Sequence, residues 1–398
     1  MLNRNFNLLW LSQIVSSIGN KLTIFGFPLV GIFIYDTTVL ETSMITVMSF
    51  LPSLLFGTII GIVVDRGDKR KIGIFTNIIC FVISIILFVF SIFKILPLWG
   101  FYILIFLLNT FLLFGSISFY SQIPMVVEKE NLKKANYKME LSNSVIDTAA
   151  PSVGGIIFGL FSAPFIFIID GITFILASFC QILLPCDIEK DKVKLKKKSI
   201  VHIREAYNYV FNNQILFKLA MSYFVLVFGI GIFQSIQFYY LSKVLNVAPY
   251  TIGMIISVGN IGLVVASISS LKISDTIGMG KTIILSFILY AVGFTLYYLS
   301  SEESTLSLFV ATMCIGAAMP LYNVNATTIR QSNVDLSMLG SVSAIWRIFG
   351  RGLIPLGAAI GGGISTYFSV EIAILISVII VLLGLCIVLF SDELKKYT

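Results

Sequence analysis

Twelve long apolar stretches constrain what this chain can fold into. A helix needs about 20 mostly apolar residues to cross the hydrocarbon core of a bilayer, and each stretch is close to that length or longer. Polar or turn-forming residues separate the stretches. The sequence therefore predicts an all-α integral membrane protein with twelve spans, at residues 8–34, 43–64, 72–94, 99–123, 139–161, 165–185, 216–241, 250–272, 282–300, 306–328, 340–366 and 371–390.

The composition supports this class and excludes several others. Of the 398 residues, 57% are hydrophobic and 12% are charged, whereas soluble domains carry roughly 25% charged residues. A soluble enzyme, a disordered chain and a disulfide-stabilised scaffold are therefore excluded. The single histidine is His202, and the five cysteines lack the spacing of a metal or disulfide site. We therefore assign no catalytic residue, no metal site and no cofactor.

Basic residues orient the predicted spans. With a cytoplasmic N-terminus, 22 of the 27 Lys and Arg residues fall in cytoplasmic segments and two in external ones, as the positive-inside rule requires. Both termini are therefore predicted to be cytoplasmic, in a chain that spans the plasma membrane many times. The same rule accounts for the net charge of +7, so the expected partner is the lipid bilayer and not nucleic acid.

The longest break between spans, residues 186–215, divides them into two sets of six. Its lysine-rich run at 190–198 is typical of a segment held near anionic lipid. Five apolar residues then follow at i, i+3, i+4, i+7 and i+8, which predicts an amphipathic helix on the inner membrane surface. We predict one six-helix bundle at 1–185, a basic linker at 186–215 and a second six-helix bundle at 216–398. The five apolar residues are Ile203, Ala206, Tyr207, Val210 and Phe211.

A short internal match relates the two sets of spans. Asp147 precedes Pro151 by four residues in the fifth span, and Arg351 precedes Pro355 by four in the eleventh, 204 residues further along the chain. Transporters built from repeats have such corresponding helices in their two halves. The match therefore favours a transporter with pseudo-symmetric halves.

The loop after the second span carries the most specific motif. It reads Gly61-Ile-Val-Val-Asp65-Arg66-Gly67-Asp68-Lys69-Arg70-Lys71. This resembles the signature loop of the major facilitator superfamily, which has a glycine, then Asp-Arg, then a basic cluster. Asp68, where many members have glycine, resembles the macrolide-efflux branch, as does Ile169-Asp170-Gly171 with Phe174 and Ser178 in the sixth span. The resemblance extends over the whole chain and implies two pseudo-symmetric bundles of six helices.

The sequence departs from that branch at three places. Ala150 replaces the usual glycine of the antiporter motif in the fifth span, and Ser341 replaces the arginine of the Gly-Arg-Val before the eleventh. Members of the branch usually have Gly-Asp in the first span, where this chain has Gly19-Asn20-Lys21. The carboxylate expected at Asn20 is therefore absent, and the coupling role proposed for it does not transfer.

The signature loop also has a physical interpretation. Gly57 and Gly61 are predicted to let the second span approach a neighbouring helix closely. Asp65 is expected to pair with an arginine or to accept hydrogen bonds from a helix N-terminus. The resemblance implies a contact between the halves that holds one conformation and breaks in the other; the alternative is a loop that only obeys the positive-inside rule. The residues assigned to this gating loop are Gly61, Asp65, Arg66, Lys69 and Arg70.

Ionisable residues inside the spans need a reason, because each costs about 2.5–3.5 kcal/mol on insertion scales. Asp147 is our first choice for proton coupling, in which a proton and the cargo occupy one site alternately. Lys21 is expected either to face an aqueous cavity, where it attracts an anionic group, or to form an internal pair. The alternative for Asp147 is a fixed ion pair with Lys21, Arg347 or Arg351.

Three further charges have other interpretations. Arg347 and Arg351 lie four residues apart and therefore share one helix face; neither can carry a proton, because arginine stays protonated. They are expected to pair with Asp147, to contact an anionic substrate or to lock the two halves. Asp170 begins the sixth span near the outer surface, where exposure favours helix capping over coupling.

Uncharged polar residues in four spans are candidates for lining a path. The resemblance implies that spans one, four, seven and ten surround a central cavity. Hydrogen bonding between helices is an equally good explanation for each residue. The cavity-lining candidates are Gln13, Asn20, Asn109, Gln234, Gln237 and Asn323.

Together with the spans and the charges inside them, the resemblance implies a monomeric secondary active exporter of amphipathic small molecules, such as a macrolide-like drug or a natural product, in exchange for protons. Export, as opposed to import, follows from the resemblance alone. A first alternative is an uncoupled or differently coupled lipid or metabolite transporter, which the absent carboxylate at Asn20 favours. A second is a membrane sensor that transports nothing, against which the charges inside the spans argue.

Overall fold

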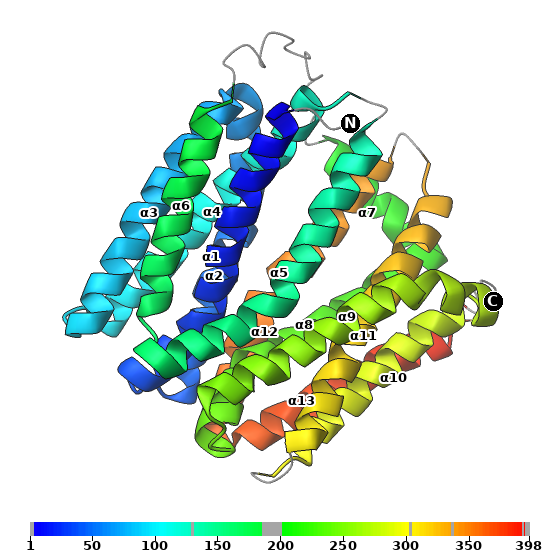
Figure 1. The fold of residues 1–398 in the computed structure, drawn as a ribbon. Coiled ribbons are helices and arrows are strands. Elements are labelled where there is room, and N and C mark those ends of the chain that lie inside the picture. Colours follow the sequence, from blue (N-terminus) through cyan, green and yellow to red (C-terminus); the bar gives the residue numbers. More distant parts are fainter. Residues whose placement is uncertain are drawn as a thin grey trace. The chain divides into compact units, whose positions relative to one another are not determined.

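The computed structural model describes residues 4–128, 131–184, 201–301, 305–335, 338–391 and 394. Within these ranges only the backbone is described at residues 133, 201–206, 339–341, 343, 344, 347–349 and 351. The described residues form α-helices joined by short turns (Figure 1). The helices are α1 (Arg4–Ile34), α2 (Val39–Arg66), α3 (Lys69–Phe93), α4 (Leu98–Val126), α5 (Leu132–Phe161), α6 (Phe165–Ile182), α7 (Val201–Asn212), α8 (Gln214–Tyr239), α9 (Pro249–Ile277), α10 (Met279–Tyr298), α11 (Thr305–Ser332), α12 (Leu339–Tyr367) and α13 (Val370–Leu389), and a π-helical turn, Tyr240–Val244, extends α8.

The predicted all-α membrane fold is confirmed. Of the helices in the described ranges, eleven are long and apolar enough to cross a membrane. The predicted span at 340–366 coincides with α12, which is 29 residues long but has several side chains outside the description. Proline lies inside six of these helices, including Pro151 in α5 and Pro355 in α12. Membrane helices tolerate proline because neighbouring groups satisfy the freed backbone carbonyls.

The chain divides into two compact units. Unit 1 comprises Met1–Thr38, Met48–Lys194 and Ala248–Met254, and unit 2 comprises Val39–Val47, Leu195–Val247 and Ile255–Thr398. The first turns of α2 therefore belong to unit 2, and the first turns of α9 belong to unit 1. The lysine-rich run predicted at 190–198 lies outside the described residues.

In unit 1, α1 packs along α6, α6 along α3, and α3 along α4, while α5 lies against α1 (Figure 1). Phe27 on α1 is central to this packing, with its ring centroid 6.1 Å from that of Phe101 on α4 and 5.7 Å from that of Phe167 on α6. All three rings are almost completely buried. Aromatic packing therefore joins three helices of this unit.

In unit 2, α10 packs on α11 and on α13, and α8 packs on α12 and on α13. Glycines let two pairs of helices pack so closely that their backbones are in contact. A methyl group at Gly316 on α11 would overlap the carbonyl oxygen of Gly259 on α9, and one at Gly357 on α12 would lie 2.6 Å from the carbonyl oxygen of Phe228 on α8. These crossings leave no room for a side chain.

A helix, α7, occupies the segment predicted to be amphipathic, and its position on the inner membrane surface stays a prediction. Val210 is 3% exposed, and α7 packs against α8 and α12 within unit 2. The hydroxyl of Tyr209 lies 3.4 Å from the carbonyl oxygen of Asn333 and 3.3 Å from Oδ2 of Asp335. Tyr209, which is not among the five predicted apolar residues, therefore contacts the chain just after α11.

Candidate functional site

An ion pair joins α1 to α5 near the middle of both helices. Lys21 Nζ lies 2.7 Å from Asp147 Oδ1, and the two side chains are 42% and 34% exposed. Of the three cations offered as partners of Asp147, the structure places Lys21 beside it. The side chains of Arg347 and Arg351, both on α12, lie outside the description.

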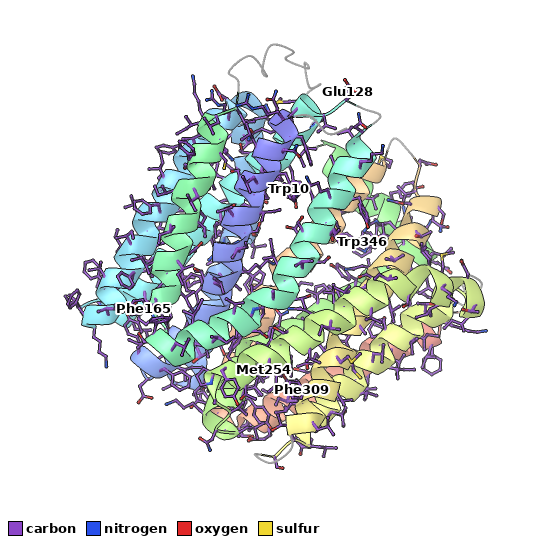
Figure 2. The ribbon with its side chains drawn as sticks, in the orientation of Figure 1. Trp10, Glu128, Phe165, Met254, Phe309 and Trp346 are labelled. Carbon is purple, nitrogen blue, oxygen red and sulfur yellow. The ribbon has the colours of Figure 1, made fainter. Side chains whose placement is uncertain are left out.

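Further contacts place α1 and α5 side by side on both sides of this pair. Trp10 on α1, labelled in Figure 2, donates a hydrogen bond from Nε1 to Ser142 Oγ on α5, at 3.2 Å. Lys138 Nζ lies over the Trp10 ring, 3.5 Å from its centroid. Near the other end, a methyl group at Gly154 would lie 2.7 Å from the Phe25 ring. The pair therefore lies within an extended helix–helix contact.

Asp170 differs from its predicted environment. It is completely buried, at 0% exposure, so the prediction of an exposed capping residue is wrong. Thr23 Oγ1 on α1 donates a 2.6 Å hydrogen bond to Asp170 Oδ2. The position of Asp170 near the start of a span predicts how deep it lies in the membrane, but not which helix covers it. Its side chain is buried because α1 packs over this side of α6. The sequence feature that marked Asp170 as important was the resemblance of Ile169-Asp170-Gly171 to the macrolide-efflux branch.

Two side chains of the signature loop form hydrogen bonds with helix ends in unit 1, namely the start of α3 and the end of α6. Asp68 caps α3, because its side chain accepts a 2.8 Å hydrogen bond from the Lys71 backbone N–H. Arg70 donates to the last carbonyls of α6, with Nε 3.0 Å from the Gln181 oxygen and Nη2 2.7 Å from the Ile182 oxygen. Asp68, which replaces the usual glycine, therefore has a structural role as a helix cap.

Among the described residues, a methyl group at Gly57 or Gly61 would meet no atom within 4 Å, so the predicted close approach of α2 is not found there. The spacing of small residues was present on α2, but it does not specify which face meets a neighbour. Asp65 and Arg66 are exposed. Within the described part of the chain neither forms an ion pair. Their gating role stays a prediction.

The polar candidates fall into three groups. Gln13 donates to Ser17 Oγ, and Asn109 to its own helix at the Ile105 carbonyl. Gln237 on α8 donates a 2.8 Å hydrogen bond to the Tyr297 hydroxyl on α10, which is a contact between helices. Three candidates make no hydrogen bond among the described residues: Gln234 and Asn323 are exposed, and Asn20 Oδ1 is buried without a partner.

Arg330, one of the basic residues counted in the predicted cytoplasmic segments, contacts an aromatic ring. The Arg330 guanidinium on α11 lies 5.0 Å from the ring centroid of Trp346 on α12, the tryptophan labelled in Figure 2. No spacing rule relates these two residues, so sequence patterns do not predict the contact. Among the described residues, no cluster of His, Cys, Asp or Glu could hold a metal ion.

Curated relatives include an efflux protein and an uncharacterized transporter. Macrolide efflux protein A of Streptococcus pyogenes is 26% identical over 222 residues, which are 54% of this chain and 53% of that protein. The match thus spans about half the length of that relative. The uncharacterized MFS-type transporter YvqJ of Bacillus subtilis is 22% identical over 400 residues, 98% of this chain and 93% of that protein.

Solved structures and a family model identify the fold. A mutant of the nucleoside transporter NupG has a TM-score of 0.84 at 10% identity, over 98% of this chain and 100% of that one. Identity this low supports the fold alone. The model of the Major Facilitator Superfamily matches residues 9–352 and 219–397. With its two compact units of membrane-spanning helices, this chain belongs to the Major Facilitator Superfamily of transporters.

Proposed function

We propose that this transporter exports amphipathic small molecules in exchange for protons and that Asp147 is the group for which protons and cargo compete. The observation that carries the proposal is the ion pair between Lys21 and Asp147, with 34% of the Asp147 side chain exposed. The pair lies in the middle of two membrane-spanning helices. It combines a carboxylate that can accept a proton with a cation that can be released.

The exposure of the pair argues for a water-accessible path. A charged side chain at mid-membrane depth costs about 2.5–3.5 kcal/mol on insertion scales, and such residues face a bundle interior or an aqueous cavity. Since a third or more of each side chain is exposed, the exposed side is expected to face water. Protons and a dissolved cargo can both reach a group in that position.

Competition at one carboxylate gives obligatory exchange. A proton bound to Asp147 neutralises the carboxylate and releases Lys21 from the ion pair. A cationic amine on the cargo competes for the same carboxylate through an ion pair of its own. The protein then carries either a proton or the cargo across the membrane, and each must leave before the other binds. Alternating access by the two halves supplies the movement.

The direction of transport and the class of cargo rest on the relatives. The name of the Streptococcus pyogenes protein specifies efflux of a macrolide, and macrolides are amphipathic compounds. At 26% identity over about half of that protein, the relation supports export of compounds of this kind without selecting one. The gating loop, Gly61 to Arg70, stays part of the proposal as the segment that responds to the occupied state.

Replacing Asp147 by asparagine tests the coupling. Everted membrane vesicles containing the full chain are given an inside-acid pH gradient, which a fluorescent dye reports, and macrolides and other amphipathic compounds are added singly. For the wild type we expect partial collapse of the gradient with at least one compound. For Asp147→Asn we expect no collapse with that compound, because the asparagine amide cannot accept the proton.

The matched control is Asp275→Asn, which removes an exposed carboxylate at the end of α9 and is expected to leave the collapse unchanged. Collapse that persists in Asp147→Asn would keep the antiporter and remove Asp147 from the coupling path. Radiolabelled cargo that crosses without any collapse in the wild type would contradict proton antiport.

A second candidate function is transport without proton coupling. The observation that favours it is the same 2.7 Å ion pair, because a carboxylate already paired with a lysine is satisfied without a proton. On this hypothesis the pair is structural and the cargo moves down its own gradient. This candidate predicts that Asp147→Asn transports radiolabelled cargo at the wild-type rate and that the transport rate of neither protein changes with pH.

A further inference from the structure

Two polar contacts hold α1 on two different sides. Lys21 pairs with Asp147 on α5, and Thr23 donates to Asp170 on α6. Two residues along an α-helix correspond to about 200° of rotation, so the two contacts lie on opposite sides of α1. Any rotation of α1 about its axis would therefore move both.

The contact with Asp170 is closely fitted. Thr23 and Asp170 are both 0% exposed, and the bond between Thr23 Oγ1 and Asp170 Oδ2 is 2.6 Å long. Thr173 Oγ1 donates to the Asp170 backbone carbonyl at 2.7 Å. A methyl group at Gly19 would overlap Asp170 Oδ1 and Thr173 Oγ1. The carboxyl group therefore reaches Thr23 only because position 19 has no side chain.

The same face of α1 follows α6 further in both directions. Ser12 Oγ donates a 2.9 Å hydrogen bond to the Ala177 carbonyl, and a methyl group at Gly26 would lie 3.2 Å from Ile166 Cδ1. The α1 positions 12, 19, 23 and 26 recur at the spacing of one helix face. Of the polar contacts along this face, the Thr23–Asp170 bond lies closest in sequence to Lys21.

We propose that Asp170 is a positioning residue that fixes the rotation of α1, through Thr23, so that Lys21 stays opposite Asp147. The ion pair is exposed on one side and joins two flexible side chains, and such pairs lose much of their interaction free energy to side-chain entropy. An anchored helix backbone reduces that loss. The importance of this positioning for transport rests on the proposed role of the pair.

The test measures how strongly Lys21 and Asp147 interact when the anchor is removed. Lys21→Gln, Asp147→Asn and the double variant are purified as full chains, and the thermal unfolding midpoint of each is measured. Non-additivity of the three shifts gives the coupling between the two residues. The set is then repeated with Thr23→Val, which removes the hydroxyl at nearly constant volume, and with Thr23→Ser, which keeps it.

We expect the coupling to fall to less than half in the Thr23→Val set and to persist in the Thr23→Ser set. The matched control is Ser12→Ala, which removes a hydrogen bond from the same face; it is expected to lower the midpoint and leave the coupling unchanged. If Thr23→Val yields no folded protein, Thr23→Ala removes the same hydroxyl and is measured instead.

Coupling that is unchanged without the Thr23 hydroxyl would overturn the proposal, because a bond that only stabilises the fold lowers every midpoint equally. An equal loss of coupling in Ser12→Ala would also overturn the proposal, because the effect would then belong to the whole α1–α6 contact and not to the Thr23–Asp170 bond. The vesicle assay separates this inference from the proposed function. If Thr23→Val loses coupling but exchanges protons like the wild type, positioning stands and the proposed role of the pair fails. If coupling persists in Thr23→Val while Asp147→Asn abolishes proton exchange, the positioning proposal fails and the proposed role of the pair stands.

Discussion

Replacing Gly316 by alanine is expected to lower the stability of the protein by about 3 kcal/mol or more. The added methyl group would overlap the backbone carbonyl oxygen of Gly259 on α9. Overpacking typically costs about 1–3 kcal/mol when side chains can adjust. Here the obstacle is backbone, so α9 and α11 must separate along their crossing. We expect little folded protein to survive detergent extraction, with a clear fall in the unfolding midpoint.

The measurement uses a buried thiol. Cys80 on α3 is 1% exposed, whereas Cys386 is exposed. In a background whose other four cysteines are replaced by alanine, a thiol-reactive fluorophore therefore reports unfolding when Cys80 becomes accessible on heating. The matched control is Gly57→Ala, where a methyl group meets no atom of the described residues within 4 Å and alanine favours the helix by roughly 0.5–1 kcal/mol. Equal midpoints for Gly316→Ala and the wild type would show that the two helices do not cross at this distance.

Reversing one charge of the α1–α5 pair is expected to have the second large effect. Lys21→Asp places two carboxylates where the structure has an ion pair of 2.7 Å. Removing one partner of a fully buried pair costs about 3–5 kcal/mol, and we expect about half of that here because the pair is partly exposed. The same thiol assay measures the loss.

Exchanging both charges provides the decisive comparison. Lys21→Asp combined with Asp147→Lys restores an ion pair at the same place, so the midpoint is expected to return most of the way to the wild-type value. A double variant as unstable as Lys21→Asp alone would contradict the pairing. In vesicles the double variant also reports whether the carboxylate must lie on α5, since the proton-accepting group has moved to α1.

Hydrophobic length was enough to predict the membrane fold. The described spans follow the apolar stretches because crossing a bilayer requires about 20 such residues whatever the neighbouring helices are. Helix α5 starts at Leu132, seven residues before the predicted span at 139, because helical backbone continues past the apolar stretch. Membrane thickness constrains the apolar segment, and it does not constrain where the helix ends.

Side-chain partners were only partly predictable. Lys21 was one of three predicted ion-pair partners of Asp147, and sequence spacing cannot show which residue of another helix lies nearest to it. Asp170 was expected to be exposed, whereas α1 buries it, because burial depends on the neighbouring helix. Gly57 and Gly61 have the spacing of a packing face, yet a methyl group at either would meet no atom of the described residues within 4 Å. Gly316 packs against the backbone of Gly259 although it belongs to no Gly-x-x-x-Gly pattern. Each difference is a property of tertiary packing.

The hydrogen bonds of Arg70 have a consequence for chimeric transporters. Arg70 ends α6 by donating to the carbonyls of Gln181 and Ile182, which follow it by 111 and 112 residues in the chain. A signature loop grafted alone into a relative would bring the guanidinium without the helix terminus that it binds. The loop and the last turn of α6 therefore form one exchangeable module, and recombination points that separate them are expected to yield fewer folded hybrids than points that keep them together.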